Sequence, residues 1–240
     1  MNYKNLTAED IYEKGLKDPI FDFEKGLDAL IEKDKKGGWI YWSGRDWKEF
    51  DFNKGMKALL ETDKTGEWTY WSGRDWKEFD YDKGMKTLLE KDKTGSWIFW
   101  AGKEWKTFDY KKGLDSLITK DKTGEWIYWA GRDWKTFEFD FGKGLPVLTE
   151  KDKDGEWIYR AGRDWKTFDF KKGLDALIEI DKDGRWICYA GIDWKTFDFK
   201  KGLKYLLKIK FNYLEDVFKY WKFPEEKLSN EEVLEFINLI

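Results

Sequence analysis

Residues 124–137 read Gly124-Glu125-Trp126-Ile127-Tyr128-Trp129-Ala130-Gly131-Arg132-Asp133-Trp134-Lys135-Thr136-Phe137, and the chain contains six versions of this stretch. The first tryptophan of each copy sets a period of 29 residues with one step of 31, at Trp39, Trp68, Trp97, Trp126, Trp157 and Trp186. A fixed period of this size indicates a repeat architecture, in which neighbouring copies bury each other's apolar faces.

The composition suits a folded chain with a heavily solvated exterior. Of 240 residues, 41% are hydrophobic, half of these aromatic, and 39% are charged. The net charge of −3 supplies no basic field, so nucleic acid and anionic membranes are not expected partners. A single cysteine excludes an internal disulfide, and the N-terminal residues lack the apolar core of a secretory signal. We therefore expect a cytoplasmic protein with no membrane span.

The aromatic part of each copy predicts a β-hairpin. Two short aromatic and β-branched runs flank the four residues from Ala130 to Asp133, and Gly131 could supply a positive φ in the turn. Pairing across this turn would place Trp129 directly opposite Trp134.

The rest of each copy predicts a helix. Asp109 suits an N-cap, and Tyr110, Leu114 and Leu117 follow on one face, before a stop ahead of Gly124. A glycine recurs in the first turns of every such helix, as at Gly113, which predicts close approach of a bulky ring, most simply a hairpin tryptophan.

We accordingly predict an α/β (α+β) repeat protein of six tandem ββα units, each about 29 residues long. The units would form an open solenoid-like array with an antiparallel hairpin layer and a helix layer. Residues 1–20 would be an N-terminal cap, residues 21–202 one continuous repeat domain and residues 203–240 a helical C-terminal cap with a second helix starting near Ser229. Because Pro146 belongs in a helix's first turn, the helix of that copy should begin late, near Gly144, with a local bend.

One face of the predicted hairpins is a candidate binding surface, because a contiguous exposed aromatic strip usually marks an interaction site. The alternative is that both hairpin faces are buried and the tryptophans are structural. The basic residues of the predicted turns, such as Arg132, could likewise meet an anionic partner or form only a solvated edge. The acid that follows each of them, such as Asp133, is expected to accept backbone N–H bonds within the turn. The candidate binding residues are Trp42, Trp47, Trp71, Trp76, Trp100, Trp105, Trp129, Trp134, Trp165, Trp194, Arg45, Arg74, Arg132 and Arg163.

Catalysis, cofactors and metals are not expected. The chain has no histidine, and Cys188 takes an aromatic position on a predicted strand, which suggests a buried thiol. Residues 152–155 and 181–184 resemble part of a calcium loop, but Ala161 and Ala190 stand where its last carboxylate is required.

The sequence therefore favours a non-catalytic recognition module that binds another protein, as a scaffold, inhibitor or immunity factor would. A binder of single-stranded nucleic acid or glycan by aromatic stacking is a second interpretation. A self-assembling structural protein, or homo-oligomer, is a third.

Overall fold

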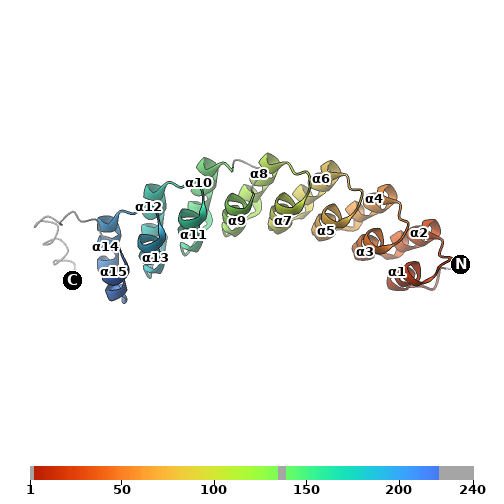
Figure 1. The fold of residues 1–240 in the computed structure, drawn as a ribbon, viewed down its shortest axis with the longest axis horizontal. Helices are drawn as coiled ribbons and strands as arrows, with labels where there is room; N and C mark the ends of the chain where they lie inside the picture. The colour runs from red at the N-terminus through yellow and green to blue at the C-terminus, as the bar shows by residue number, and fades with distance from the viewer. Residues whose placement is uncertain (1–2, 135–138, 222–240) are drawn as a thin grey trace, which may run out of the picture. The chain divides into compact units, whose positions relative to one another are not determined.

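The computed structural model describes residues 3–134 and 139–221, and within these residues it contains fifteen helices and no strand (Figure 1). The predicted ββα unit is therefore wrong. The first aromatic run and the turn of the predicted hairpin form one helix, α9 (Glu125–Asp133), and the turn glycine lies inside that helix. Ile127, Tyr128 and Ala130 are its buried residues, which is a helical spacing and not the alternation of a strand.

Two kinds of helix alternate along the chain. We call the first kind the Asp-capped helices, because each follows an aspartate whose carboxylate accepts a backbone N–H from the first turn. They are α2 (Phe23–Lys33), α4 (Phe52–Thr62), α6 (Tyr81–Lys91), α8 (Tyr110–Lys120), α10 (Phe141–Lys151), α12 (Phe170–Ile180) and α14 (Phe199–Lys208).

The second kind, the Trp helices, begin after a left-handed glycine and carry the first tryptophan of each copy. They are α3 (Gly38–Asp46), α5 (Glu67–Asp75), α7 (Ser96–Glu104), α9, α11 (Glu156–Asp164) and α13 (Arg185–Asp193). Helix α1 (Ala8–Lys17) precedes this alternation and α15 (Leu214–Tyr220) follows it.

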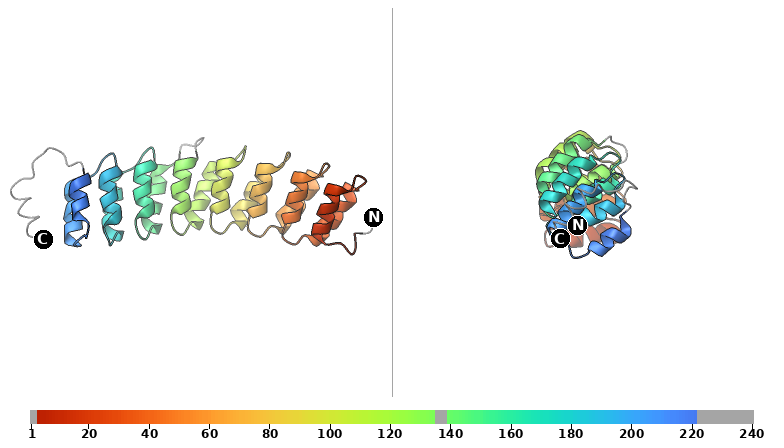
Figure 2. Two further views of the ribbon diagram at one scale, coloured as in Figure 1. Left: turned by 60° about the horizontal axis from the view of Figure 1, so that its bottom comes forward. Right: turned by 90° about the vertical axis from the view of Figure 1, so that its left-hand side faces the viewer.

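The chain divides into two compact units, one ending at Lys120 and one beginning at Asp121. In the first unit the Asp-capped helices pack side by side in one layer, and α3, α5 and α7 pack in a second (Figures 1 and 2). The second unit has the same arrangement, with α10, α12 and α14 in one layer and α9, α11 and α13 in the other.

The sequence prediction was correct for the Asp-capped helix itself. Helix α8 spans Tyr110–Lys120 and buries Leu114 and Leu117 as expected. The late start near Gly144 was wrong, because α10 begins at Phe141 and contains Pro146. The proline has no N–H to donate to the carbonyl of Gly142, and Gly142 is an exposed residue. Residues 135–138 of the insertion and the helix predicted near Ser229 lie outside the described residues.

A buried carboxylate joins each Asp-capped helix to the following Trp helix. At the end of α4, the Asp63 side chain accepts backbone N–H bonds from Thr65, Gly66 and Thr69 at 2.8–3.0 Å. Gly66 has a φ of +85°, which a residue with a side chain rarely adopts. The Asp63 carboxylate thus accepts N–H groups at the start of the following Trp helix, α5. It stabilises a helix where the aromatic composition alone suggested a strand.

The turn between α12 and α13, capped by Asp181, is expected to make the stability of the second unit depend on pH. Burial, followed by the neighbouring Asp183 carboxyl, raises the pKa of Asp181 to about 7. The folded-state pKa of Asp181 lies above the ordinary aspartate value. The stability that the Asp181 carboxyl contributes is therefore complete below about pH 4 and is lost as the pH rises through about 7.

We predict that Asp183→Thr stabilises the second unit by about 1 kcal/mol at pH 8. Threonine at this position donates to the capping carboxylate in earlier copies, as Thr94 does to Asp92 at 3.1 Å. Thermal unfolding from pH 4 to pH 8 measures the effect. The gain should shrink towards pH 4, and a gain independent of pH would contradict this explanation.

Within each unit, a tryptophan locks successive helices of the Trp layer together. The ring of Trp76, which follows α5, packs on Gly44 of α3, and its indole N–H donates to the Tyr41 carbonyl at 3.0 Å. The same contact recurs at Trp47, Trp105, Trp165, Trp194 and Trp221. The contact requires glycine, because a methyl group at Gly44 would lie 2.5 Å from the Trp76 ring.

The glycines of the Asp-capped helices also accept a ring, though not the one expected. Phe50, which precedes α4, covers Gly55, and Phe79 covers Gly84 in the same way. The locking tryptophan lies behind this phenylalanine, with Trp105 Cη2 at 3.2 Å from a methyl position on Gly84. The predicted close approach is present, but phenylalanine makes the nearer contact.

Two buried hydroxyl groups are predicted to weaken the first unit. The Oγ atoms of Ser43 and Ser72 are buried without a hydrogen-bond partner, and α7, α9, α11 and α13 carry alanine at this position. Each change to alanine should add about 1 kcal/mol to the free energy of unfolding. Urea unfolding measures this, with Ser96→Ala as a control, because the Ser96 hydroxyl lies 2.9 Å from the Thr94 hydroxyl and should give no gain.

Candidate functional site

The solvent side of the Trp helices carries tryptophan and arginine one turn apart. The guanidinium of Arg45 lies 3.9 Å from the centre of the Trp42 ring, and Arg74 lies 3.9 Å from Trp71. We call the set on each unit its Arg–Trp face. In the first unit it comprises Trp39, Trp42, Arg45, Trp68, Trp71, Arg74, Trp97, Trp100 and Lys103. In the second unit it comprises Trp126, Trp129, Arg132, Trp157, Arg160, Arg163, Trp186 and Tyr189.

The predicted pairing of Trp42 with Trp47, and of the equivalent tryptophans in other copies, is wrong. Trp42 lies within α3, whereas Trp47 is the residue that ends this helix. Trp42 is half-buried on the Arg–Trp face, whereas Trp47 is only 5% exposed and belongs to the lock. Of the ten tryptophans predicted to form the binding surface, those that remain half-buried at the surface are Trp42, Trp71, Trp100 and Trp129. Those buried in the lock or its equivalent position are Trp47, Trp76, Trp105, Trp134, Trp165 and Trp194.

The conserved acid of each copy does not cap a backbone turn, as the sequence suggested. Asp75 accepts from the guanidinium of its neighbour Arg74 at 2.7 and 3.0 Å and from the hydroxyl of Tyr41, on the preceding Trp helix, at 2.6 Å. Burial alone would raise the pKa of Asp75, but the bonds from Arg74 and Tyr41 outweigh it and hold this pKa below its usual value. Burial and the bond to Asp75 raise the pKa of Tyr41 to about 12. The acid therefore links adjacent repeats and neutralises the cation beside it.

The first tryptophan of each copy also belongs to this face, although it was not among the residues predicted for binding. Trp68 packs on Tyr41 of the preceding Trp helix with ring centres 5.5 Å apart, and Trp97 stacks on Tyr70 at 5.3 Å. The spacing Trp39, Trp42, Arg45 is the signal that could have found it, since residues three apart share one helix face.

A hollow of about 460 Å³ opens at the N-terminal end of the first unit's face. Trp39, Trp42 and Trp68 line it, with Lys35 and Lys36 at its rim. The first residue of α3, Gly38, lines the hollow, and the other Trp helices begin with a residue that has a side chain. A flat aromatic pocket with basic edges suits an apolar side chain flanked by acidic groups.

The face changes character at α13. Tyr189 and Ile192 replace the tryptophan and arginine there and are 44% and 40% exposed. Cys188, beneath them, is buried as predicted but on a helix, and burial raises the pKa of its thiol to about 11. A thiol with this pKa is protonated at neutral pH, which suits a packing role.

Comparison with known proteins gives no relative for the chain: no family model matches it, nor does any curated protein or solved structure. None of the helices in the described residues is both apolar enough and long enough to span a bilayer. Across residues 3–134 and 139–221, no group of three acidic or cysteine side chains is arranged to hold a metal ion.

Proposed function

We propose that this chain is a non-catalytic, cytoplasmic recognition protein that binds another protein through its Arg–Trp face. The observation that supports the proposal is the repetition of half-buried tryptophans with stacked cations on successive helices. Tryptophan and arginine dominate the binding energy of protein interfaces, and side chains already fixed in place lose little entropy on binding. Scaffold, inhibitor and immunity roles all use a surface of this kind.

The arrangement favours a protein partner over a stacked base or sugar. Arg45, Arg74 and Arg132 each cover one face of the neighbouring tryptophan, so a flat ligand on that side must displace the guanidinium. Each of these arginines is also paired with the adjacent aspartate, at 2.7 Å in every case. The positive field that attracts a nucleic-acid backbone is therefore largely cancelled.

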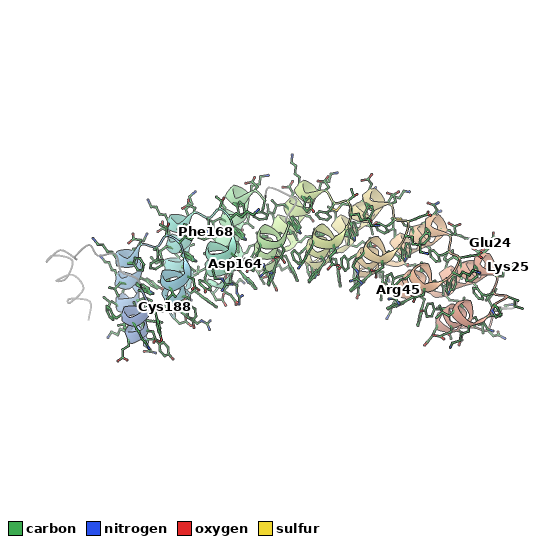
Figure 3. The ribbon with its side chains drawn as sticks, in the orientation of Figure 1. Glu24, Lys25, Arg45, Asp164, Phe168 and Cys188 are labelled. Carbon is green, nitrogen blue, oxygen red and sulfur yellow. The ribbon has the colours of Figure 1, made fainter. Side chains whose placement is uncertain are left out.

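Site-specific photo-crosslinking tests the proposal in the cells that make the protein. A photoreactive phenylalanine analogue would replace Arg45 or Arg74, and Lys25 on the exposed side of α2 would be the control position (Figure 3). We expect one discrete protein to crosslink from positions 45 and 74 and not from 25. Crosslinks from all three positions, or from none, would contradict the proposal.

The same experiment separates the alternatives. A crosslinked species of twice the chain mass would assign the Arg–Trp face to self-association. Crosslinked nucleic acid, lost on nuclease treatment, would assign it to single-stranded nucleic acid. Either result would overturn binding of a different protein as the role of this face.

A further inference from the structure

The hollow at the N-terminal end of the first unit's Arg–Trp face has a basic rim that no other copy shares. Residues 33–38 read Lys-Asp-Lys-Lys-Gly-Gly, with three lysines and one aspartate. The other five copies hold at most two basic residues in the same six positions. The basic rim therefore belongs to one place in the array and is not a property of the repeat.

The charge of this rim is not cancelled by a carboxylate. Asp34 is the one acidic residue among the described residues that line the hollow. It is 3% exposed, and its side chain accepts three backbone N–H groups of the turn that follows, at 2.9–3.0 Å. Lys33 and Lys35 donate to uncharged backbone carbonyls, and Lys36 is exposed. A ligand in the hollow therefore meets three positive charges and no accessible negative one.

Two residues of this rim replace groups that stabilise the start of other Trp helices. Thr65 and Thr94 stand at the position of Lys36, and their hydroxyls bond to the capping aspartate at 3.3 and 3.1 Å. Helices α5, α9 and α11 begin with a glutamate, whose charge suits a helix N-terminus, whereas α3 begins with Gly38. The first copy loses both local contributions, and each of the two replacements makes the rim more positive.

The floor of the hollow is aromatic and fixed in place. Trp39, Trp42 and Trp68 line it. Arg45 covers one side of Trp42 at 3.9 Å, and Tyr41 packs against Trp68 with ring centres 5.5 Å apart. Because these contacts already occupy part of the ring surfaces, the floor favours a bulky apolar side chain over a flat base held between two rings.

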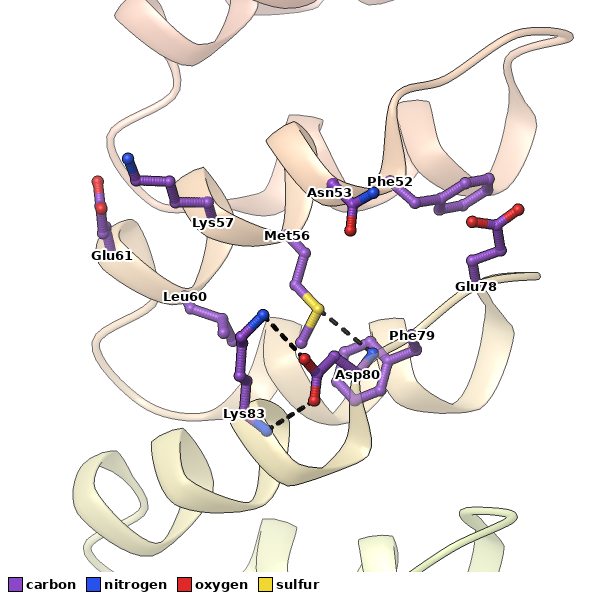
Figure 4. Close-up of a pocket in the computed structure, with 10 residues that line it drawn as sticks. All are labelled: Phe52, Asn53, Met56, Lys57, Leu60, Glu61, Glu78, Phe79, Asp80 and Lys83. Carbon is purple, nitrogen blue, oxygen red and sulfur yellow. Dashed lines mark hydrogen bonds and ion pairs between the residues drawn. The ribbon is translucent and has the colours of Figure 1, made fainter.

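The larger groove between α4 and α6 has no such bias (Figure 4). Its volume is about 630 Å³, but Glu61, Glu78 and Asp80 line it together with Lys57 and Lys83. Lys83 pairs with Asp80 at 2.9 Å. A groove with both charges in its lining selects neither in a ligand. In the basic hollow, charge and apolar surface instead point to one class of ligand.

We infer that this hollow anchors the protein partner of the Arg–Trp face by holding a large apolar side chain of an acidic segment. The inference rests on the proposed function and specifies the chemistry of the partner. The apolar side chain packs against the three tryptophans, and carboxylates on either side of it pair with the lysines of the rim. Since exposed ion pairs alone contribute little, the apolar contact supplies most of the affinity and the charges select the segment.

The probe is the fluorescein-labelled peptide Glu-Asp-Leu-Phe-Asp-Glu, titrated with the full chain and followed by fluorescence anisotropy. We expect saturable binding that weakens between about 20 and 150 mM salt. Lys36→Thr and Gly38→Glu install residues that other copies carry, and each should lower the affinity at least about fivefold. Lys93→Thr is the control, because it removes the same charge from an exposed position of the third copy, and it should change the affinity less than about twofold.

Thermal unfolding separates a lost site from a lost fold. Threonine at position 36 can bond to Asp34 as Thr94 does to Asp92, so Lys36→Thr should unfold at the same temperature as the unsubstituted chain or higher. Absence of saturable binding, equal binding of a peptide with glutamine and asparagine in place of the acids, or equal binding by both hollow variants would each overturn the inference. Tighter binding of a single-stranded hexanucleotide would overturn it too, by assigning the hollow to nucleic acid.

Failure of this inference is distinct from failure of the proposed function. If a partner protein crosslinks from positions 45 and 74 equally well with and without Lys36→Thr and Gly38→Glu, the face binds a protein that the hollow does not anchor, and the inference is overturned. If nothing crosslinks from the unsubstituted chain, the proposed function itself fails, whatever the peptide does.

Discussion

Replacing Gly44 with alanine is expected to destabilise the first unit by about 3 kcal/mol, combining overpacking with the loss of a buried hydrogen bond. The added methyl group would lie 2.5 Å from Cε2 of Trp76. That ring is 3% exposed, and its indole N–H is bonded to the Tyr41 carbonyl at 3.0 Å, so it cannot move away without breaking the bond. Urea unfolding followed by circular dichroism would measure the loss.

A second glycine provides the control. Gly142 lies in the first turn of α10 and is exposed, and a methyl group there would meet the Asp140 side chain, with Oδ1 at 3.2 Å, among the described residues. Gly142→Ala should therefore be neutral or add up to about 1 kcal/mol, since alanine is the better helix former. Equal losses for the two variants would show that the Trp76 contact does not determine the cost.

Pro146→Asp is expected to stabilise the second unit by about 2–3 kcal/mol, because an interior proline costs a helix about 3 kcal/mol. Aspartate restores the N–H that can donate to the Gly142 carbonyl. It also stands where Asp28 and Asp175 pair with a lysine of the next Asp-capped helix. Both Pro146 and that lysine, Lys172, line the groove between α10 and α12, so the new pair can form.

Pro146→Ala separates the two contributions. It restores the N–H without a charge and should give most of the gain, while the exposed ion pair adds less than about 1 kcal/mol and weakens with salt. Thermal unfolding at low and high salt measures both parts. No gain from either variant would mean that α10 tolerates its proline without cost.

The sequence was sufficient for the repeat and for one helix in each copy, because these depend on local signals. The period follows from Trp39 and its equivalents, and an aspartate cap with an apolar stripe defines α8. The hairpin prediction failed because Gly131 between two aromatic runs has the composition of a turn, and aromatic β-propensity depends strongly on context. What decided the helix was the buried Asp121 before it, which accepts the Gly124 and Ile127 N–H groups at 3.0 Å.

The candidate site was predictable only in part, for a related reason. Arg45 and Arg74 were expected at an edge of the array, either meeting a partner or solvated, and both side chains are exposed. Trp47 and Trp76 were assigned to the same face because a hairpin would pair them with Trp42 and Trp71. Their burial depends on a glycine in the preceding repeat, about thirty residues earlier, and such a contact becomes evident only when the helices are stacked.

Hydrogen exchange of the indole N–H groups, followed by NMR on protein labelled at tryptophan, tests most directly whether the chain has a buried lock and an open Arg–Trp face. We predict two classes. Trp47, Trp76, Trp105, Trp165 and Trp194 should exchange slowly, because each N–H is bonded to a backbone carbonyl of an earlier helix. Trp42, Trp71, Trp100 and Trp129 should exchange much faster. Equal protection of both classes, or the reverse order, would contradict the division between lock and face on which the proposed function rests.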